Sequence, residues 1–467
     1  MLFAFCSVLV WPYAELTSDD GSQLLDAWMR LQEGDWFSLH VRSSQGPRFS
    51  PLASWLLAAA LSVRPSVTAV QALVLGLNLI ALVLVRQVAR KLRLRLEGLL
   101  TGFLILLLPA LSLNYTGKLC NPGFILPASA WVLWARFCRR GRSRWIHLAL
   151  SLFFALQIHF SFVIHAAWFL LERFMPRLKV RIPGPFALVP ALLLLAACLG
   201  APGLPLLKNL VDLIAPGSGY MAARSAPIGG FLENSWFIPV GILPLFAQLS
   251  SGPALLAARP SARRALWLHL SFSILALAAS PLVLEGSAHQ WVLAWVIPAL
   301  LLLEMGLERL SRSSIRRAAA LTVLLLVMAT RDYVGAFALI ALSGGTGWHG
   351  PNLEARRDIL SFIAQKRPGD SIVLAGPPAE ANASLSGWLA LATLPGEFGG
   401  KLRLQPGTGR TVVIREMGSL GWSPECDSVK MAMLHSSGAT SVYQAQGPLD
   451  PTWPAIGQVK ARPRKSE

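Results

Sequence analysis

The chain has few charged residues, and this scarcity excludes an ordinary soluble protein. Only 14% of its 467 residues are Asp, Glu, Lys or Arg, whereas 54% are hydrophobic. A soluble domain usually carries about 25% charged residues. Apolar stretches recur along roughly the first 340 residues with basic clusters between them. This pattern is typical of a protein with many transmembrane helices.

Acidic residues are the scarcer of the two charge types, which gives a formal net charge of +18. Half of the Lys and Arg residues fall in five short clusters between apolar runs. These clusters are Arg86 to Arg95, Arg136 to Arg144, Arg173 to Arg181, Arg259 to Arg264 and Arg309 to Arg317. Because cytoplasmic loops of membrane proteins retain Lys and Arg, the clusters predict membrane topology and argue against a nucleic-acid partner. If all five are cytoplasmic, the apolar runs alternate to give about eleven transmembrane helices.

Two kinds of site are also missing from the sequence. The five cysteines show neither CxxC spacing nor a neighbouring histidine pair, so a structural zinc site is disfavoured. A disulfide between Cys120 and Cys426 remains open, although free cysteines are favoured. No glycine-rich phosphate-binding loop is present, so the sequence indicates no nucleotide pocket.

The composition changes near residue 340, where the chain becomes polar and rich in Gly and Pro. A helix-like segment at 353–365 and strand-like runs at 371–375 and 411–414 predict a small soluble α/β domain over residues 341–467. Residues 1–340 form the predicted membrane domain, with an outer loop at 17–66. The alternation of helices places this loop and the C-terminal domain together on the extracytoplasmic side.

An acidic pair, Asp19 and Asp20, stands where the chain leaves its first apolar run. Repulsion between neighbouring carboxylates and partial desolvation can raise the pKa of one of them and make it a usable base. The pair could instead hold a divalent cation. In a purely structural alternative, Asp20 is the N-cap of an amphipathic helix, Gln23 closes a capping box and Asp19 favours the helix dipole.

Arg48 is a lone cation just before the apolar stretch 51–63, which is predicted to lie at the outer membrane interface. A guanidinium at this position suits a lipid phosphate, because it can donate two parallel hydrogen bonds. The alternative is an arginine that snorkels to ordinary lipid headgroups.

Other polar residues are predicted at the outer ends of membrane helices. They are Lys118, Asn121, Gln157, His159, His289 and Gln290. Polar groups at membrane depth are costly and are therefore functional candidates. His159 has a structural alternative as a residue of helix packing. It also marks the point at which the stretch 145–171, too short for two full spans, must turn.

Four of these features in this order resemble the GT-C glycosyltransferases. They are the acidic pair, a Gly-Pro-x-x-x-Pro-Leu-x-x-Trp stretch at 46–55, an Asn-Pro at 121–122 and a Gln-x-His at 157–159. The closest likeness is to the protein O-mannosyltransferase-like (family 39) and aminoarabinose-transferase-like branch, over roughly residues 1–340. The predicted fold class is therefore an α-helical polytopic membrane protein of GT-C type with a small α/β extracytoplasmic domain.

The resemblance implies an enzyme of the bacterial inner membrane that works on the periplasmic face. It would take a sugar from a polyprenyl-phosphate-linked donor and pass it to a lipid, glycan or protein acceptor. Asp19 matches the first acid of the family's pair, the base or acceptor-orienting carboxylate, and Asp20 matches its neighbour. Arg48 and Lys118 match cations that face the donor phosphate.

The remaining candidates are expected to bind substrate. Asn121, Gln157 and His159 match motif positions, and His289 and Gln290 are added for their place at a helix end. The turn at 114–121 lacks the second acid that several members carry, and Cys120 stands where an aromatic residue is usual. These departures leave acceptor chemistry and metal dependence open.

Two non-enzymatic alternatives remain. A flippase or transporter of lipid-linked glycans would be expected to show internal symmetry and a binding site near the membrane midplane. The ionisable residues instead lie near helix ends, which favours the enzyme. A non-catalytic family member is the other alternative, because the second acid is missing.

Overall fold

The computed structural model describes residues 7–14, 16–34, 36, 51–107, 118–159, 162, 288–343, 351–367, 370–375, 378–399, 402, 411–416, 431–437, 440–445 and 455–456. The predicted count of about eleven membrane helices stays a prediction, because the apolar runs between 163 and 287 lie outside these ranges.

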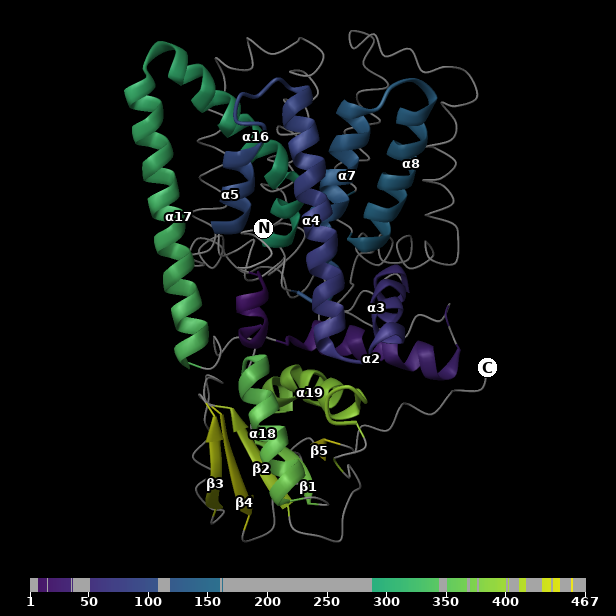
Figure 1. Cartoon of the computed structure of the whole chain (residues 1–467). Helices are drawn as coiled ribbons and strands as arrows, with labels where there is room; N and C mark the ends of the chain where they lie inside the picture. The colour runs from purple at the N-terminus through teal and green to yellow at the C-terminus, as the bar shows by residue number, and fades with distance from the viewer. Residues whose placement is uncertain are drawn as a thin grey trace, which may run out of the picture.

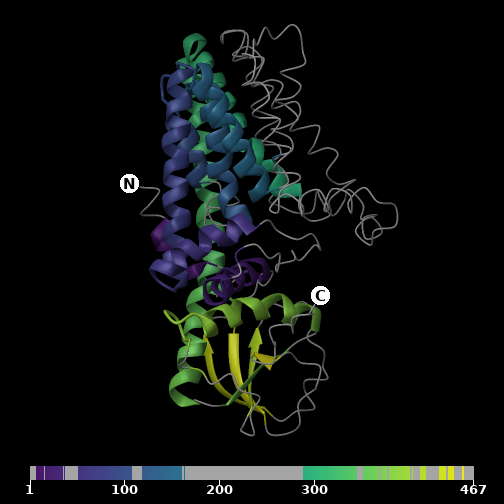
Figure 2. The same cartoon turned by 90° about the vertical axis from the view of Figure 1, so that its right-hand side faces the viewer.

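A bundle of helices forms the larger part of the described structure (Figures 1 and 2). Its members are α4 (Val67–Lys91), α5 (Leu99–Leu107), α7 (Ile125–Cys138), α8 (Gly141–Ile158), α16 (Ala288–Ser313) and α17 (Ile315–Ser343). α7 packs between α4 and α8, and α16 packs against α17. Among the described helices, α4 is long and apolar enough to cross a membrane by length and composition.

Large apolar side chains are exposed on the outer surface of the bundle. Ile80 and Val83 on α4, and Val323, Leu324 and Val327 on α17, are each more than half exposed. Contiguous exposed apolar surface of this kind is rare on soluble proteins. It supports the predicted contact of the bundle with lipid.

Three of the five basic clusters lie at one end of the bundle. The turns α4–α5, α7–α8 and α16–α17, which carry residues 86–95, 136–144 and 309–317, share the end opposite the C-terminal strands (Figure 1). The clusters at 173–181 and 259–264 lie outside the described residues. The arrangement of the three described clusters is the one that the sequence predicts for cytoplasmic loops.

Two glutamates of α16 hold the α4–α5 turn in place. Glu304, which is fully buried, accepts hydrogen bonds from the backbone N–H of Gly98 (2.8 Å) and from Thr101 N (3.0 Å) and Oγ1 (2.8 Å). Glu308 accepts from Leu96 N at 2.9 Å. The two carboxylates therefore satisfy amides at the start of α5 that have no partner within that helix.

The C-terminal part is an α/β unit with a five-stranded sheet in the order β3-β4-β2-β1-β5. Its elements are α18 (Leu353–Lys366), β1 (Ser371–Ala375), α19 (Pro378–Thr393), β2 (Thr411–Glu416), β3 (Met431–Ser437), β4 (Thr440–Ala445) and β5 (Ala455–Ile456). β1 and β2 are parallel, and the other pairs are antiparallel. α18, β1 and β2 lie where the sequence predicts them, whereas α19 and β3 to β5 were not predicted.

The predicted outer loop 17–66 contains two helices, α2 (Ser18–Glu33) and α3 (Pro51–Val63). α2 lies across the lower end of the bundle, between the bundle and the C-terminal unit (Figure 1). It packs against α3 and against α19. The short helices η1 (Trp11–Tyr13) and η2 (Asn121–Phe124) complete the described elements.

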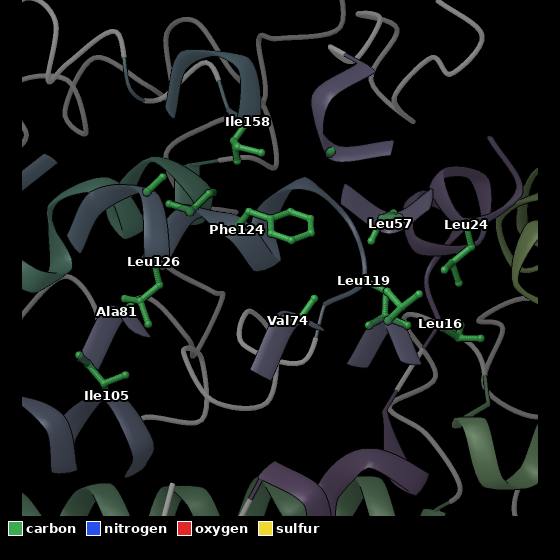
Figure 3. Close-up of a cluster of buried hydrophobic side chains, with 14 of the residues drawn as sticks. Leu16, Leu24, Leu57, Val74, Ala81, Ile105, Leu119, Phe124, Leu126 and Ile158 are labelled. Atoms are coloured by element: carbon green, nitrogen blue, oxygen red, sulfur yellow. The ribbon is translucent and has the colours of Figure 1, made fainter. Parts of the chain in front are cut away.

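One hydrophobic core runs through these elements. Figure 3 shows members of it from several helices, including Leu24 of α2, Leu57 of α3, Val74 of α4 and Phe124 of η2. Leu119, between the bundle and α2, belongs to the same cluster. The outer helices are therefore packed onto the bundle by the same apolar contacts that hold the bundle together.

Hydrogen bonds fix the C-terminal unit to the end of the bundle opposite the three described basic clusters. Gly396 N donates to Pro65 O at 2.8 Å, just before α4 begins. The carboxylate of Glu397 pairs with Arg357 at 2.7 Å and accepts from Val67 N at 3.1 Å. Glu397 thus links α18 to the first amide of α4.

Gly21 allows α2 and α19 to approach closely, and its substitution is the first test of this packing. A Cβ at Gly21 would lie 2.3 Å from the carbonyl carbon of Ser386 and 2.4 Å from the N of Gly387. We expect Gly21→Ala to destabilise the protein by about 1–3 kcal/mol, the usual cost of overpacking. Thermal unfolding of the purified protein in detergent measures the change.

The matched control is Gly76→Ala in α4, where an added Cβ meets nothing within 4 Å. Because alanine is the better helix former by about 1 kcal/mol, this variant should be neutral or slightly more stable. Equal unfolding temperatures for the two variants would contradict the close approach of α2 to α19.

Candidate active site

Helix α2 begins with a capping box that lies one helical turn before the expected position. Thr17 is the N-cap and its hydroxyl accepts from Asp20 N at 3.3 Å. Asp20 Oδ2 accepts in return from Thr17 N at 3.0 Å and from Thr17 Oγ1 at 2.6 Å. The expectation that Asp20 caps the helix and Gln23 closes the box is therefore wrong: Asp20 closes the box instead.

The second carboxylate oxygen of Asp20 binds a distant part of the chain. Asp20 Oδ1 accepts from Leu119 N at 2.8 Å, across 99 positions of sequence. The ammonium of Lys118 lies 3.7 Å from Asp20 Oδ2. Since Asp20 is fully buried and both its oxygens accept hydrogen bonds, it serves to position α2 against the 118–120 turn.

Asp19 is the more accessible carboxylate of the pair, with a partly exposed side chain. It lies close enough to Cys120 to act on that thiol: burial raises the pKa of Cys120 well above its usual value, and Asp20 and then Asp19 raise it further. The thiol is therefore protonated and is not a nucleophile. Cys120 is a free cysteine, and Cys426 lies outside the described residues.

Lys118 and Asn121 are brought to the acidic pair by the 118–121 turn. The side chain of Lys118 is 15% exposed, which leaves its ammonium within reach of a ligand. Asn121 begins η2 and is almost fully buried, and within the described ranges its Oδ1 has no hydrogen-bond partner. A buried carbonyl oxygen without a partner is a candidate for a ligand contact.

Gln157 and His159 lie at the end of α8, where the sequence predicts the chain to turn. His159 is the C-cap of α8, in extended backbone conformation, and Gln157 is buried two residues earlier. α8 contacts α3 and η2, and Figure 3 shows Ile158 of α8 in the same buried cluster as Phe124 of η2. These two residues thus share one end of the bundle, the end opposite the described basic clusters, with the acidic pair.

Three predicted residues are not tested by this geometry. Arg48 lies outside the described residues. His289 and Gln290 fall in the first turn of α16, but their side chains lie outside the described part of the structure. The sequence places Arg48 three residues before α3, which packs against α2.

Sequence reasoning missed a buried polar stripe on α2. Arg30 Nε pairs with Asp26 Oδ2 at 2.7 Å, and both side chains are nearly inaccessible. Arg30 Nη1 also donates to Trp36 O (2.8 Å), an oxygen that accepts from Trp55 Nε1 of α3 (2.6 Å). The 4-3-4 spacing of Asp19, Gln23, Asp26 and Arg30 along one helix was the signal that could have revealed it.

The proposed use of Asp19 and Asp20 as cation ligands receives little support from the geometry. Asp20 already accepts from Thr17 and Leu119 and lies beside the Lys118 ammonium, which disfavours a second cation. Over the described ranges, no group of three or more His, Cys, Asp and Glu side chains is arranged to hold a metal ion.

No protein-family model matches the chain, and no curated protein matches it. Among solved structures, it is similar to ArnT from Cupriavidus metallidurans bound to undecaprenyl phosphate, with a TM-score of 0.52 at 12% identity, over 95% of this chain and 97% of that one. The apo state of the same protein aligns at 13% identity over the same shares, with a TM-score of 0.48. The first comparison shows that the chain has the fold of ArnT. The chain therefore shares the overall fold of that protein, and its membership of the GT-C superfamily and of a branch within it stays a prediction.

The different roles of the two aspartates can be separated by stability. Asp20→Asn should destabilise the protein by about 2–4 kcal/mol, because it breaks a capping box and the charge-assisted bond to Leu119. Asp19→Asn removes one partly exposed acid from the first turn of α2 and should cost less than about 1 kcal/mol. Urea unfolding followed by tryptophan fluorescence compares the two, and equal losses would contradict the positioning role of Asp20.

Proposed function

We propose that the chain is a glycosyltransferase of GT-C type that uses a polyprenyl-phosphate-linked sugar. It passes the sugar to an acceptor on the periplasmic face of the bacterial inner membrane. The observation that carries the proposal is the position of Asp19 at the start of α2, beside the Lys118 turn, at the outer end of an ArnT-like fold. The ArnT structure with undecaprenyl phosphate supports the choice of donor lipid.

Asp19 is the base in this scheme. It takes a proton from the acceptor hydroxyl or amine, whose oxygen or nitrogen then attacks the anomeric carbon of the donor sugar. The bond from that carbon to the phosphate oxygen breaks, and polyprenyl phosphate leaves with inversion at the sugar. Asp20 does not take part in the proton transfer; as a positioning residue it holds α2 and the 118–120 turn together.

Cations stabilise the leaving phosphate. The ammonium of Lys118 is 3.7 Å from Asp20, which fixes its location while its N–H donors remain able to meet phosphate oxygens. Arg48, at the entrance to α3, is the second proposed cation. No nucleotide pocket is required, because the sugar arrives already activated on the lipid phosphate.

The basic clusters support the proposed orientation. Three of them share the end of the bundle opposite the site, and Lys and Arg are retained on the cytoplasmic side. The acidic pair and the C-terminal unit then face the periplasm.

Cysteine labelling tests this orientation. We expect Glu33→Cys, at the exposed end of α2, to react with a membrane-impermeant maleimide in intact spheroplasts. Ser143→Cys, in the exposed first turn of α8, should react only after lysis. The parent protein supplies the background labelling. The reverse pattern would place the acidic pair in the cytoplasm and end the proposal.

Transfer activity tests the chemistry. The purified protein is incubated with undecaprenyl phosphate carrying radiolabelled mannose, glucose or 4-amino-arabinose and with membrane extract as the acceptor. Asp19→Asn should lower transfer about 10²–10⁴-fold, the usual contribution of a general base. Lys118→Met should lower kcat and kcat/KM for the donor, because the ammonium is proposed to stabilise the charge that develops on the departing phosphate.

Asp358→Asn is the matched control, because this aspartate is half exposed on the C-terminal unit, paired with His435. It should transfer as wild type does. If Asp19→Asn is as active as wild type, the base is misassigned. A wild-type protein that binds the donor but transfers no sugar would favour the non-catalytic family member, which the missing second acid keeps as the other candidate.

A further inference from the structure

The polar stripe of α2 faces away from the C-terminal unit. Gly21 contacts the backbone of α19, so that side of α2 faces α19. At 3.6 residues per turn, Gln23 lies roughly half a turn around the helix from Gly21, and Asp19, Asp26 and Arg30 fall on the same side as Gln23. Since α2 lies between the C-terminal unit and the bundle (Figures 1 and 2), the stripe is on the bundle side.

Among the residues that the structure describes, Gln23 is buried and has no hydrogen-bond partner. The residue is 0% exposed, and neither its Nε2 nor its Oε1 has a partner. One turn further, Asp26 Oδ1 is also without a partner, although Asp26 Oδ2 binds Arg30. More than nine in ten buried polar groups in proteins are paired, so three unpaired atoms on two residues one turn apart in α2 point to a site for a ligand.

The chemistry of these atoms selects the ligand. An amide offers both a donor and an acceptor, and the carboxylate of Asp26 offers an acceptor whose charge Arg30 already balances. Neighbouring hydroxyl groups, each of which donates and accepts, match this set. A phosphate does not, because it brings acceptors and negative charge to Oδ1 of Asp26.

We infer that Gln23 and Asp26 bind hydroxyl groups of the sugar that is transferred. The inference rests on the proposed function and extends it from the reacting atoms to sugar recognition. Gln23 lies one turn along the stripe from Asp19, and Lys118 lies beside Asp20 in the first turn of the same helix. A sugar whose phosphate meets Lys118 and whose anomeric carbon lies near Asp19 extends along α2 toward Gln23.

The arrangement has a thermodynamic signature. In the protein without ligand, the amide of Gln23 has lost its contacts with water and has gained none. With an apolar side chain of similar length in its place, the ligand-free protein should therefore be at least as stable. Such a side chain cannot form a hydrogen bond with a hydroxyl group. A residue with only a structural role would lose stability on the same substitution.

The test compares wild type, Gln23→Met and Asn78→Leu in the full-length purified protein. Asn78, a buried amide in α4 with an unpaired Oδ1, is the matched control. Undecaprenyl phosphate without sugar, and the same lipid carrying mannose, glucose or 4-amino-arabinose, are the probes. Melting temperature and Kd are measured for each protein.

We expect Gln23→Met to melt at or above the wild-type temperature without ligand. Its Kd for the preferred sugar-carrying lipid should rise at least tenfold, while its Kd for the sugar-free lipid stays unchanged. Asn78→Leu should bind both lipids as wild type does.

Unchanged binding of the sugar-carrying lipid by Gln23→Met would overturn the inference. The Gln23 amide would then form its hydrogen bonds with water and not with a sugar. An equal loss for both lipids would also overturn it, because the change would then not be specific to the sugar. If wild type binds no sugar-carrying lipid at all, the proposed function itself fails.

Discussion

A single buried carboxylate holds the candidate site together. Asp20 closes the capping box of α2 and accepts from the backbone of Leu119, so two segments that are far apart in sequence share one side chain. Buried charge is tolerated only where hydrogen bonds and opposite charge compensate its desolvation. Thr17, Leu119 and Lys118 supply that compensation. The position of Asp19, of Lys118 and of the start of η2 all follow from this one residue.

The same region is clamped from the other side by the C-terminal unit. Gly21 lets α19 lie directly against α2, while Glu397 links α18 to the start of α4. α2 is thereby packed between two bodies and cannot rotate about its axis without breaking one of these contacts. That restraint is what directs the polar stripe, and with it Gln23, toward the bundle.

The sequence was informative where local pattern and structure agree. Ser371–Ala375 is a strand because its β-branched and aliphatic run follows the turn-forming sequence Pro-Gly-Asp, and α8 ends near His159 as the sequence predicts. α19 was missed because its many Ala, Ser and Gly residues show little amphipathic pattern, and β3 because Met-Ala-Met-Leu lacks β-branched residues.

At the site, the sequence predicted which motifs are present and in what order, but it could not predict the contacts between them. Thr17 and Asp20 are both good N-cap residues, and the local sequence does not decide between them. A hydrogen bond from Leu119 decides in favour of Thr17 as the cap, and no periodicity could show that bond. The partner of Lys118 and the unmet amide of Gln23 likewise depend on tertiary packing.

At the opposite end of the bundle, the amides at the start of α5 donate hydrogen bonds to side chains of α16, a helix that is synthesised much later. Glu304 and Glu308 stand 203 to 212 positions beyond the amides that they bind. While the ribosome is still producing the intervening chain, the start of α5 lacks these partners. Biogenesis must therefore keep that helix end in contact with water or with an insertion factor until α16 arrives. The native arrangement of α5 is for this reason a late event in the assembly of the protein.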